Sequence, residues 1–458
     1  MRLIWRLALA GTVLFALAQF IHPVIPTQPA KAELNIPSSV KQILEKSCYS
    51  CHSDEPRLAW FDQIAPGYWF VRHDILTARA DLNFSTLGAA PPAVQRAKLF
   101  EAVNMIQLGA MPLPQFVALH PRAKLTTEEL ATLKAFVAPW GTLPPLSIGA
   151  NGNDALLVAH HDLGTTSFSL TAVEPERNGF AFDQSFEKWR LLSTTDRGDN
   201  NAFRFILGNE IAVKAAQSGN ISRWPDDARF AKIAWEQNLG ADGLIHPGNF
   251  VQVELMAKDA RRYKDTDGWG WGRWRGLALK PYGENAHFVD ECTGCHAPVR
   301  DNDYVYTLPI TSAHLNHHRV VNNAAASLPA SLPWQPLEWR ALTMYVNPKT
   351  RTTATLYRND TAVQTLERRD VAAVRRLGYP SGTVLALVTW AQRDDPHWFG
   401  GRIPDRPLKV EFVQTSSANG AVIYRVFEGK ALTESHSSAQ NSAQRTDFIL
   451  NLRPVSLP

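Results

Sequence analysis

The four cysteines of the chain form two C-x-x-C-H motifs. Cys48, Cys51 and His52 make the first motif, and Cys292, Cys295 and His296 make the second. About 244 residues separate the two motifs. Two thiols on one helical turn can each form a thioether with a porphyrin vinyl group, and the adjacent histidine can then ligate the iron. Each motif therefore predicts a covalently bound haem c.

Two other uses of paired cysteines explain less of the pattern. A zinc ribbon also contains two C-x-x-C pairs, but its pairs usually lie about 15–20 residues apart. Disulfides within each pair would leave the histidines unexplained, although only 14 of the 458 residues are histidine. Haem attachment uses all six motif residues, so we expect two haem c groups and no disulfide.

The bulk composition is that of a globular protein with several domains. The chain has 458 residues, of which 45% are hydrophobic and 20% are charged. This length exceeds one ordinary domain, and the balance allows real cores to form. A formal net charge of +4 is too small to indicate a nucleic-acid partner.

The N-terminus has the pattern of an export signal. Arg2 and Arg6 precede an uncharged, mostly apolar run at residues 7–21. As a helix this run would span about 22 Å, less than the roughly 30 Å hydrocarbon core of a bilayer. The sequence Ala30-Lys31-Ala32 suits a signal peptidase. We expect a periplasmic protein, with residues 1–32 either cleaved or retained as an inner-membrane anchor.

Residues 33–145 are expected to form an all-α, cytochrome c-like domain. The sequence "SVKQILEKSCYSCH" predicts a helix that runs into the first motif, with Val40, Ile43 and Leu44 on one face. The sequence "LTTEELATLKAFVAPW" predicts a closing helix that begins with a capping box of Thr126 and Glu129.

The sixth ligand of the first iron should lie between these helices. Met111 sits in "LGAMPLPQF", where two prolines stiffen the loop. A thioether on such a loop can ligate the iron opposite His52. His120 and His73 are competing ligands, and a buried core methionine is the alternative role for Met111.

The same residues resemble a family of small haem-binding domains in exported bacterial proteins. The resemblance covers "ILEKSCYSCHSDEPRLAWFDQIAPGYWFVRHDILTARADLNFS" and "GAMPLPQFVALHPRAKLTTEEL". Residues 64–66 and Trp69 match the family's "IAP…W" segment, and Met111 matches its Met-Pro loop. The resemblance implies a His/Met haem with both axial positions filled, which suits electron transfer.

Residues 180–310 are expected to form a mainly antiparallel β domain that carries the second motif near its end. The segments "NAFRFILGN", "RFAKIAWEQ", "NFVQVELMAKD" and "WGWGRWRGLAL" alternate like strands and are bounded by turn-forming residues. In the third of these segments, alternation places Gln252, Glu254 and Met256 on one face. This is not a cytochrome c fold.

These residues resemble the cytochrome P-460 family. The matching segments are "WRLLS", "RFILGNEIAVKA", "WPDDARFAKIAWEQ", "VELMAKDARRY", "GWGWGRW" and "ECTGCH". The resemblance implies a five-coordinate haem c with His296 as the proximal ligand and Cys292 and Cys295 as thioether anchors. Members whose porphyrin is also cross-linked to a lysine oxidise hydroxylamine, and relatives without the cross-link bind nitric oxide.

The C-terminal third repeats the second module without cysteines. Residues 224–237 align without gaps with residues 379–392, residues 208–215 with 358–365, and residues 253–255 with 410–412. We therefore expect a haem-less copy at residues 337–430.

This copy helps to select candidate lysines, because Lys232 aligns with Leu387. A strand lysine that becomes leucine where no haem is expected is our candidate for the cross-link. Lys214 and Lys258 are alternatives, and a solvent-facing position is the structural alternative for Lys232.

Glu254 is a weaker candidate, as an acceptor of a substrate proton. It persists as Glu411 in the copy, which favours a role in the fold. A solvent-facing glutamate is the structural alternative.

The predicted fold is α+β and multidomain, with an all-α cytochrome c-like domain followed by two mainly antiparallel β cytochrome P-460-like domains. The expected segments are a signal or anchor at 1–32, the haem-binding domain at 33–145, a linker at 146–179, the haem c β domain at 180–310, a linker at 311–336, the haem-less repeat at 337–430, and a polar tail at 431–458. Within this tail, the polar sequence "ESHSSAQNSAQRTD" is expected to be mobile.

The predicted function is oxidation of hydroxylamine or a related small nitrogen compound at the second iron. The first haem would relay electrons to an external acceptor such as a small cytochrome. The alternatives are a protein that binds nitric oxide or another small ligand without turnover, and a simple electron carrier.

Overall fold

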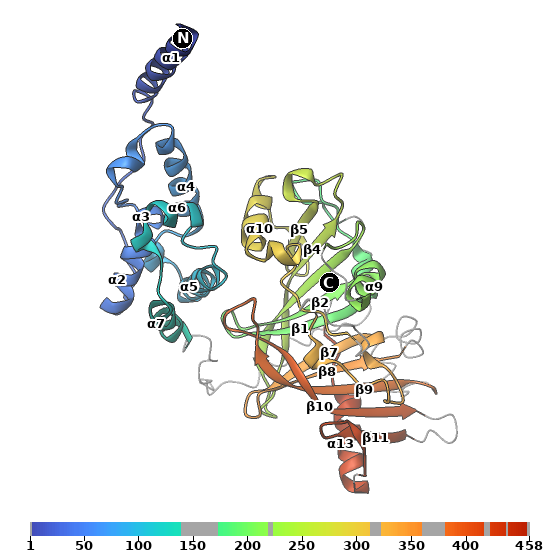
Figure 1. Cartoon of the computed structure of the whole chain (residues 1–458). Coiled ribbons are helices and arrows are strands. Elements are labelled where there is room, and N and C mark those ends of the chain that lie inside the picture. The colour runs from blue at the N-terminus through green and yellow to red at the C-terminus, as the bar shows by residue number, and fades with distance from the viewer. Residues whose placement is uncertain are drawn as a thin grey trace. The chain divides into compact units, whose positions relative to one another are not determined.

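Helices and strands separate along the chain as the sequence predicts (Figure 1). The structure is a computed structural model that describes residues 2–138, 173–218, 223–311, 322–359, 381–415, 422–436 and 438–455. It divides into two units, residues 1–140 and 141–458, each described by itself below. The α+β multidomain fold class is confirmed.

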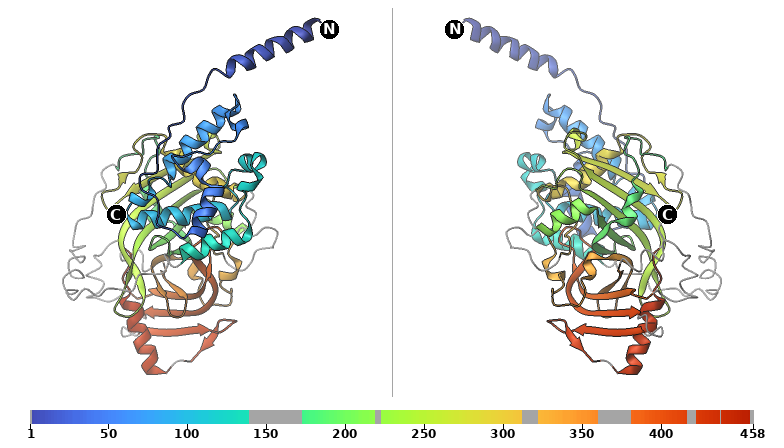
Figure 2. Two further views of the ribbon diagram at one scale, coloured as in Figure 1. Left: turned by 90° about the vertical axis from the view of Figure 1, so that its left-hand side faces the viewer. Right: turned by 90° about the vertical axis from the view of Figure 1, so that its right-hand side faces the viewer.

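The described part of the first unit contains helices and connecting segments but no strand. Its α-helices are α1 (Arg2–Ala18), α2 (Ser38–Ser47), α3 (Tyr49–His52), α4 (Gly67–Asp81), α5 (Pro92–Gln107), α6 (Pro114–Leu119) and α7 (Thr127–Val137). Helix α1 projects from the rest of this unit (Figure 2). Within the described ranges, no helix is both long enough and apolar enough to cross a membrane.

Residues 19–34, which connect α1 to α2, form a strap that is bonded to the rest of the first unit. The Gln19 side chain exchanges two hydrogen bonds of 3.0 Å with the Ala65 backbone. The Tyr68 hydroxyl donates to the Pro23 carbonyl, and the Trp69 indole donates to the Ile21 carbonyl at 2.8 Å. The strap is therefore held along the N-terminal part of α4.

The far end of the strap is bonded equally firmly. The Ala32 N–H donates to the Ser85 carbonyl at 2.9 Å, and the Ala32 carbonyl accepts from the Gly88 N–H at 2.9 Å. A Cβ atom at Gly88 would lie 2.3 Å from the Glu33 carbonyl oxygen, so only glycine allows this close approach. Because Leu34 is also buried, residues 19–34 are part of the domain's packing.

The first and last predicted helices of this domain form and pack together. Val40, Ile43 and Leu44 are buried on α2, as their spacing predicts. At α7, the Thr126 hydroxyl accepts from the Glu129 N–H, and the Glu129 carboxylate accepts from the Thr126 N–H, which confirms the capping box.

The second unit is built from antiparallel strands. They are β1 (Arg190–Arg197), β2 (Ala202–Gly208), β3 (Arg229–Leu239), β4 (Ile245–Lys258), β5 (Trp269–Arg275), β6 (Lys280–Pro281), β7 (Arg340–Asn347), β8 (Thr352–Arg358), β9 (Val384–Asp394), β10 (Gly401–Thr415), β11 (Val422–Glu428) and β12 (Thr433–Ser435). They pair in the order β1-β2-β3-β4-β7-β8-β9-β10-β11-β12, with β5 on β4 and β6 on β5. Strand β1 also pairs with β10, so the path from β1 to β10 closes on itself.

Equivalent strands of the two copies occupy equivalent places in this closed path. Lys232 pairs with Glu254 across β3 and β4, and Leu387 pairs with Glu411 across β9 and β10, as the alignment requires. The two pairings that join the copies, Ile245 with Val346 and Arg402 with Asp196, use equivalent strand positions. The copies therefore pair with each other in a pseudo-twofold manner.

The inner faces of both copies share one core. It contains Trp235 and Trp390, each with no exposed surface, together with Phe203, Val253 and Val410. Trp235 and Trp390 occupy equivalent positions in β3 and β9, and both are completely buried in this core.

The outer face of each copy is covered separately. Helices α9 (Glu210–Ser218) and α10 (Phe288–His296) contribute to the cluster on the first copy, and α13 (Ala439–Asn451) covers the second copy (Figure 1). Ile449 of α13 is fully buried against strand residues that include Leu356, Leu387 and Val413. The expectation of a mobile tail is wrong for these residues, because apolar positions within a polar segment form a helix that only the sheet can stabilise.

Helix α13 is also held by a buried ion pair. Arg445 donates from Nε and Nη2 to the two Glu411 oxygens at 2.7 Å each. The Tyr424 hydroxyl donates to the same carboxylate at 2.7 Å. Glu411 is fully buried, so its charge depends on these partners.

Replacing Arg445 with methionine should destabilise the second unit by about 3 kcal/mol, because it leaves the buried Glu411 carboxylate short of its main partner. The measurement is the free energy of unfolding in urea. Arg425→Met is the control, since Arg425 pairs with Glu434 in the same bidentate geometry at the surface. Equal effects of the two substitutions would contradict the assigned role of burial.

Candidate haem sites

The first motif lies on the short helix α3. The ring nitrogen Nδ1 of His52 is 2.9 Å from the Leu82 carbonyl oxygen, and as a donor it fixes the ring and leaves Nε2 for a metal. Cys48 and Cys51 are free thiols. Burial raises their pKa values to about 12 and about 11, so both are neutral at physiological pH.

The proposed sixth ligand of the first iron lies between α5 and α6. The Met111 N–H donates to the Met105 carbonyl at 3.2 Å, and the Met111 side chain is half-buried. His120 contacts Asp62 through Nε2 at 3.0 Å and Phe116 through Nδ1 at 3.1 Å, so both of its ring nitrogens are engaged. His73 is exposed on α4. Of the three candidates, Met111 is the one on the loop, and its ligation stays a prediction.

The second motif lies at the end of α10. The Nδ1 atom of His296 is 2.6 Å from the Tyr304 carbonyl oxygen, the same arrangement as for His52. Asp303 and Tyr304 have φ angles of 47° and 67°, a left-handed turn that directs this carbonyl back toward the helix. Burial raises the pKa of Cys292 to about 12 and lowers that of His296 to about 4, so both groups are neutral.

These surroundings fit a haem on the outer face of the first copy. The His296 ring lies edge-on to Trp271, with centroids 4.5 Å apart. The indole nitrogens of Trp224 and Trp271 are buried in this region without a hydrogen-bond partner. A cluster of aromatic rings with unused indole donors beside the two thiols of the motif and an oriented imidazole matches what a porphyrin requires.

The structure brings Lys232 and Glu254 together on this same outer face. Their side chains form an ion pair, and they are 27% and 16% exposed, so neither faces solvent freely. Glu254 also lies 3.4 Å from Nε of Arg273, and it accepts from the Gln252 amide. The alternation predicted for β4 is confirmed, because Val253 and Leu255 are buried in the opposite, inner core.

The charges of this cluster are strongly coupled. Burial lowers the pKa of Lys232 to about 8, although Glu254 opposes the change. Burial alone would raise the pKa of Glu254, but Lys232 and Arg273 outweigh it and hold that pKa far below its usual value. At neutral pH the lysine is thus mostly protonated but has a fraction of neutral amine, while the glutamate is fully ionised.

Two cations of the cluster were missed by the sequence reasoning. Arg204 lies on the outer face of β2, and burial lowers its pKa to about 10. Arg273 pairs directly with Glu254 from β5. Strand register makes Ala354 and Val426 their equivalents in the haem-less copy. Both arginines are thus replaced by uncharged residues in the haem-less copy, as Lys232 is. The alignment of the two copies would have selected them too if it had included strands β2 and β5.

The alternative lysines have other partners. Lys214 lies on α9 with 71% of its side chain exposed, and it pairs with Glu210. Lys258 is buried, lies 2.9 Å from Asp303, and contacts the Trp269 ring at 4.7 Å. Lys258 thus supports the turn that carries the carbonyl partner of His296.

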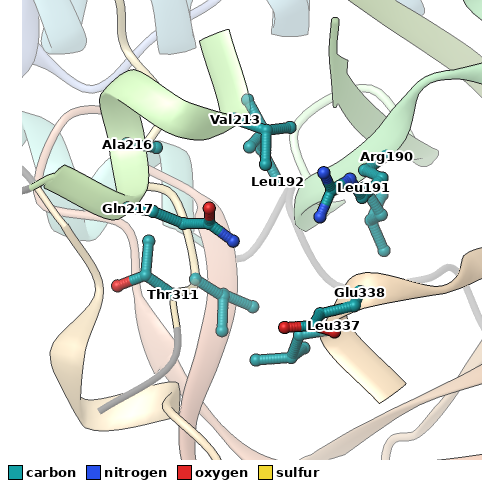
Figure 3. A pocket seen from close by; sticks show the side chains of 10 residues that line it. Arg190, Leu191, Leu192, Val213, Ala216, Gln217, Thr311, Leu337 and Glu338 are labelled. Atoms are coloured by element: carbon teal, nitrogen blue, oxygen red, sulfur yellow. The ribbon is translucent and has the colours of Figure 1, made fainter. Parts of the chain in front are cut away.

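A cavity elsewhere in the second unit does not compete with this site. It lies among β1, α9 and the segments around Thr311 and Glu338 (Figure 3). Its volume is about 20 Å³, enough for one water molecule. Gln217 from α9 is among the polar side chains that line it (Figure 3).

Lys258→Met should destabilise the second unit by about 3 kcal/mol, because it leaves the buried Asp303 carboxylate without its charged partner. The free energy of unfolding in urea measures this loss, and Lys264→Met, at an exposed lysine six residues further on, is the control. If Lys258→Met is as stable as the control, the ion pair does not support the turn.

Comparison with protein families matches the two parts of the chain that contain the motifs. Residues 10–139 match the model of a haem-binding domain, and residues 183–307 match the model of cytochrome P460. No curated protein gave a significant match to the chain. Haem is therefore the cofactor, and the chain joins a haem-binding domain to a domain of the cytochrome P460 family.

Proposed function

We propose that this protein is an exported dihaem c-type cytochrome that oxidises hydroxylamine or a related small nitrogen compound at its second iron. Cys48, Cys51 and His52 would hold the first haem, and Cys292, Cys295 and His296 would hold the second. Met111 would complete the coordination of the first iron, which would pass electrons to an external acceptor such as a small cytochrome.

The shared geometry of the two histidines carries the proposal of two haems. In both motifs Nδ1 lies within hydrogen-bond distance of a backbone carbonyl outside the motif, at Leu82 and at Tyr304. Such a partner selects the tautomer in which Nε2 is free to ligate iron, and it strengthens the ligand. Neither arrangement is needed for a disulfide.

The charged cluster on β3, β4 and β5 supports an enzyme at the second site. A five-coordinate haem iron there would supply a coordination position and a redox centre for a small nitrogen compound. Lys232, with its pKa near 8, would be partly present as the neutral, nucleophilic amine. A bond from its Nζ to a rim carbon of the porphyrin would replace one N–H and one C–H bond, and a two-electron oxidant such as a peroxide would accept the two electrons while two protons are released.

The bond between Lys232 and the porphyrin would also change the pKa of the neighbouring Glu254. With Lys232 bonded to the porphyrin, Glu254 would lose one of the three cations, Lys232, Arg273 and Arg204, that depress its pKa. The pKa of Glu254 would then rise, and a carboxylate with a higher pKa is a better acceptor of a substrate proton. Arg273 would remain to hold the carboxylate in place.

The strap at residues 19–34 supports retention of α1 in the mature protein, where this helix would attach to the membrane surface without spanning the bilayer. Cleavage after Ala32 would remove every hydrogen bond that the strap makes to α4 and to Ser85. It would also uncover the Gly88 surface against which Ala32 and Glu33 lie. Helix α1 exposes Leu3, Trp5 and Leu9 to its surroundings, and Arg6 lies within the same helix.

Lys232→Leu, which introduces the residue found at the equivalent place in the haem-less copy, should remove the cross-link. We expect the mass of the purified chain to retain two haems, the peptide around Lys232 to separate from the haem peptide after digestion, and hydroxylamine turnover to fall at least 100-fold, about 2.7 kcal/mol in activation free energy. Lys214→Leu is the matched control, because Lys214 is exposed on α9.

The outcomes separate the competing functions. Turnover that survives Lys232→Leu unchanged would contradict the choice of this lysine. A wild-type second haem held only by Cys292 and Cys295, with an ordinary ferrous Soret band, would contradict the oxidase and favour a protein that binds nitric oxide. A mass corresponding to a single haem would contradict the dihaem proposal.

The mature protein should keep its N-terminal residues and fractionate with the membrane. Intact mass and N-terminal sequencing of the protein exported by its host test this directly. A mature N-terminus at Glu33, in a soluble fraction, would show that the strap is removed.

A further inference from the structure

The turn between β9 and β10 of the haem-less copy reaches the proximal side of the second motif. Arg402 and Gly401, at the start of β10, pair with Asp196 and Arg197 of β1. The Gly198 N–H donates to the Gly400 carbonyl at 3.2 Å. These bonds attach the turn, residues 395–400, to the first copy.

Two side chains of the turn at residues 395–400 contact Tyr306. This tyrosine lies just after the other turn, at Asp303 and Tyr304, that carries the carbonyl partner of His296. Nδ1 of His397 lies 2.7 Å from the Tyr306 carbonyl oxygen. The Trp398 ring packs on the Tyr306 ring with centroids 5.6 Å apart at an angle of 68°. The haem-less copy therefore holds both the backbone and the ring of Tyr306.

Tyr306 in turn contacts two residues of the haem-attachment motif. Its ring lies 5.0 Å from the His296 ring at an angle of 80°. Its hydroxyl donates to the Cys295 carbonyl at 2.6 Å. Since Trp271 packs against the His296 ring as well, the imidazole is held by two aromatic rings, one from β5 and one backed by the other copy.

The position of Trp398 is itself fixed by a buried ion pair. Arg197 and Asp199 pair with each other, and their side chains are only 4% and 3% exposed. The Arg197 guanidinium lies 4.0 Å from the Trp398 ring centroid, and the Trp398 indole donates to Asp199 at 3.4 Å. A cation held over the ring face and an acceptor at the ring edge leave Trp398 little freedom.

The length of the turn agrees with a dedicated role. Trp390 and Arg402 of the second copy occupy the same strand positions as Trp235 and Ile245 of the first. Trp390 and Arg402 are 12 positions apart in the sequence, whereas Trp235 and Ile245 are 10 positions apart. The extra residues lie in the stretch that contains His397 and Trp398. The shorter turn, at residues 240–244, contains no aromatic residue.

We propose that the haem-less copy supports the proximal ligand of the other copy's haem, with Trp398 and His397 as positioning residues that act through Tyr306. The inference rests on haem attachment at Cys292, Cys295 and His296. The orientation of the His296 ring, and the strength of its bond to iron, then depend on side chains about 100 residues away in a copy that has no haem-attachment motif.

The test uses the full-length protein with both haems attached and measures the iron–histidine stretching band of the ferrous form by resonance Raman. Trp398→Leu and His397→Ala should shift and broaden this band, because the Tyr306 ring loses its support. Tyr306→Phe, which keeps the ring but removes the bond to the Cys295 carbonyl, should shift it less.

Trp334→Leu is the matched control. Trp334 is a half-buried tryptophan that precedes the haem-less copy and packs on Phe412 of that copy. An unchanged band in both Trp398→Leu and His397→Ala, or an equal change in Trp334→Leu, would overturn the inference. If the wild-type peptide at residues 292–296 carries no haem, the failure belongs instead to the proposed function, and intact mass distinguishes the two cases.

Discussion

The second unit depends on covering the outer faces of a closed sheet. Its inner core is shared by both copies, so each outer face has to be buried against something else. In the haem-less copy, α13 does this with Ile449 against Leu356 and Leu387. In the other copy, α9 and α10 flank a surface that keeps Lys232, Arg204 and Arg273 instead of aliphatic residues. Charges at such positions are costly unless they have partners, which is why this face indicates a cofactor site.

A glutamate occupies the same strand position in both copies but has different partners in each. Glu411 is fully buried and binds α13 through Arg445. Glu254 occupies the equivalent place and pairs with Lys232 and with Arg273 of the adjacent strand β5. Because the copy without cysteines has a glutamate at the same position, Glu254 is a weaker candidate for a catalytic group. The structure gives it a structural role in both copies and adds, in one of them, a pKa that depends on Lys232.

The copies also depend on each other through their pairing. Equivalent residues join β4 to β7 and β10 to β1, so each copy extends a hairpin toward the other. The hairpin of the haem-less copy carries Trp398 to Tyr306 and so to His296. A copy without cysteines is thereby connected to the imidazole ring of His296 in its neighbour.

Local patterns in the sequence were sufficient for the motifs, the helices and the strands. C-x-x-C-H, the capping box at Thr126 and Glu129, and the alternation in β4 depend on residues only a few positions apart, so the sequence alone determines them. The internal repeat added a comparison within the chain that selected Lys232. Tertiary structure decided the rest: the helix at residues 439–451, the partners of Glu254, and the contact of Trp398 with Tyr306. Each of these joins segments that are distant in the chain, and pairings of that kind are set by the closure of the sheet and the burial of its faces, which no short pattern encodes.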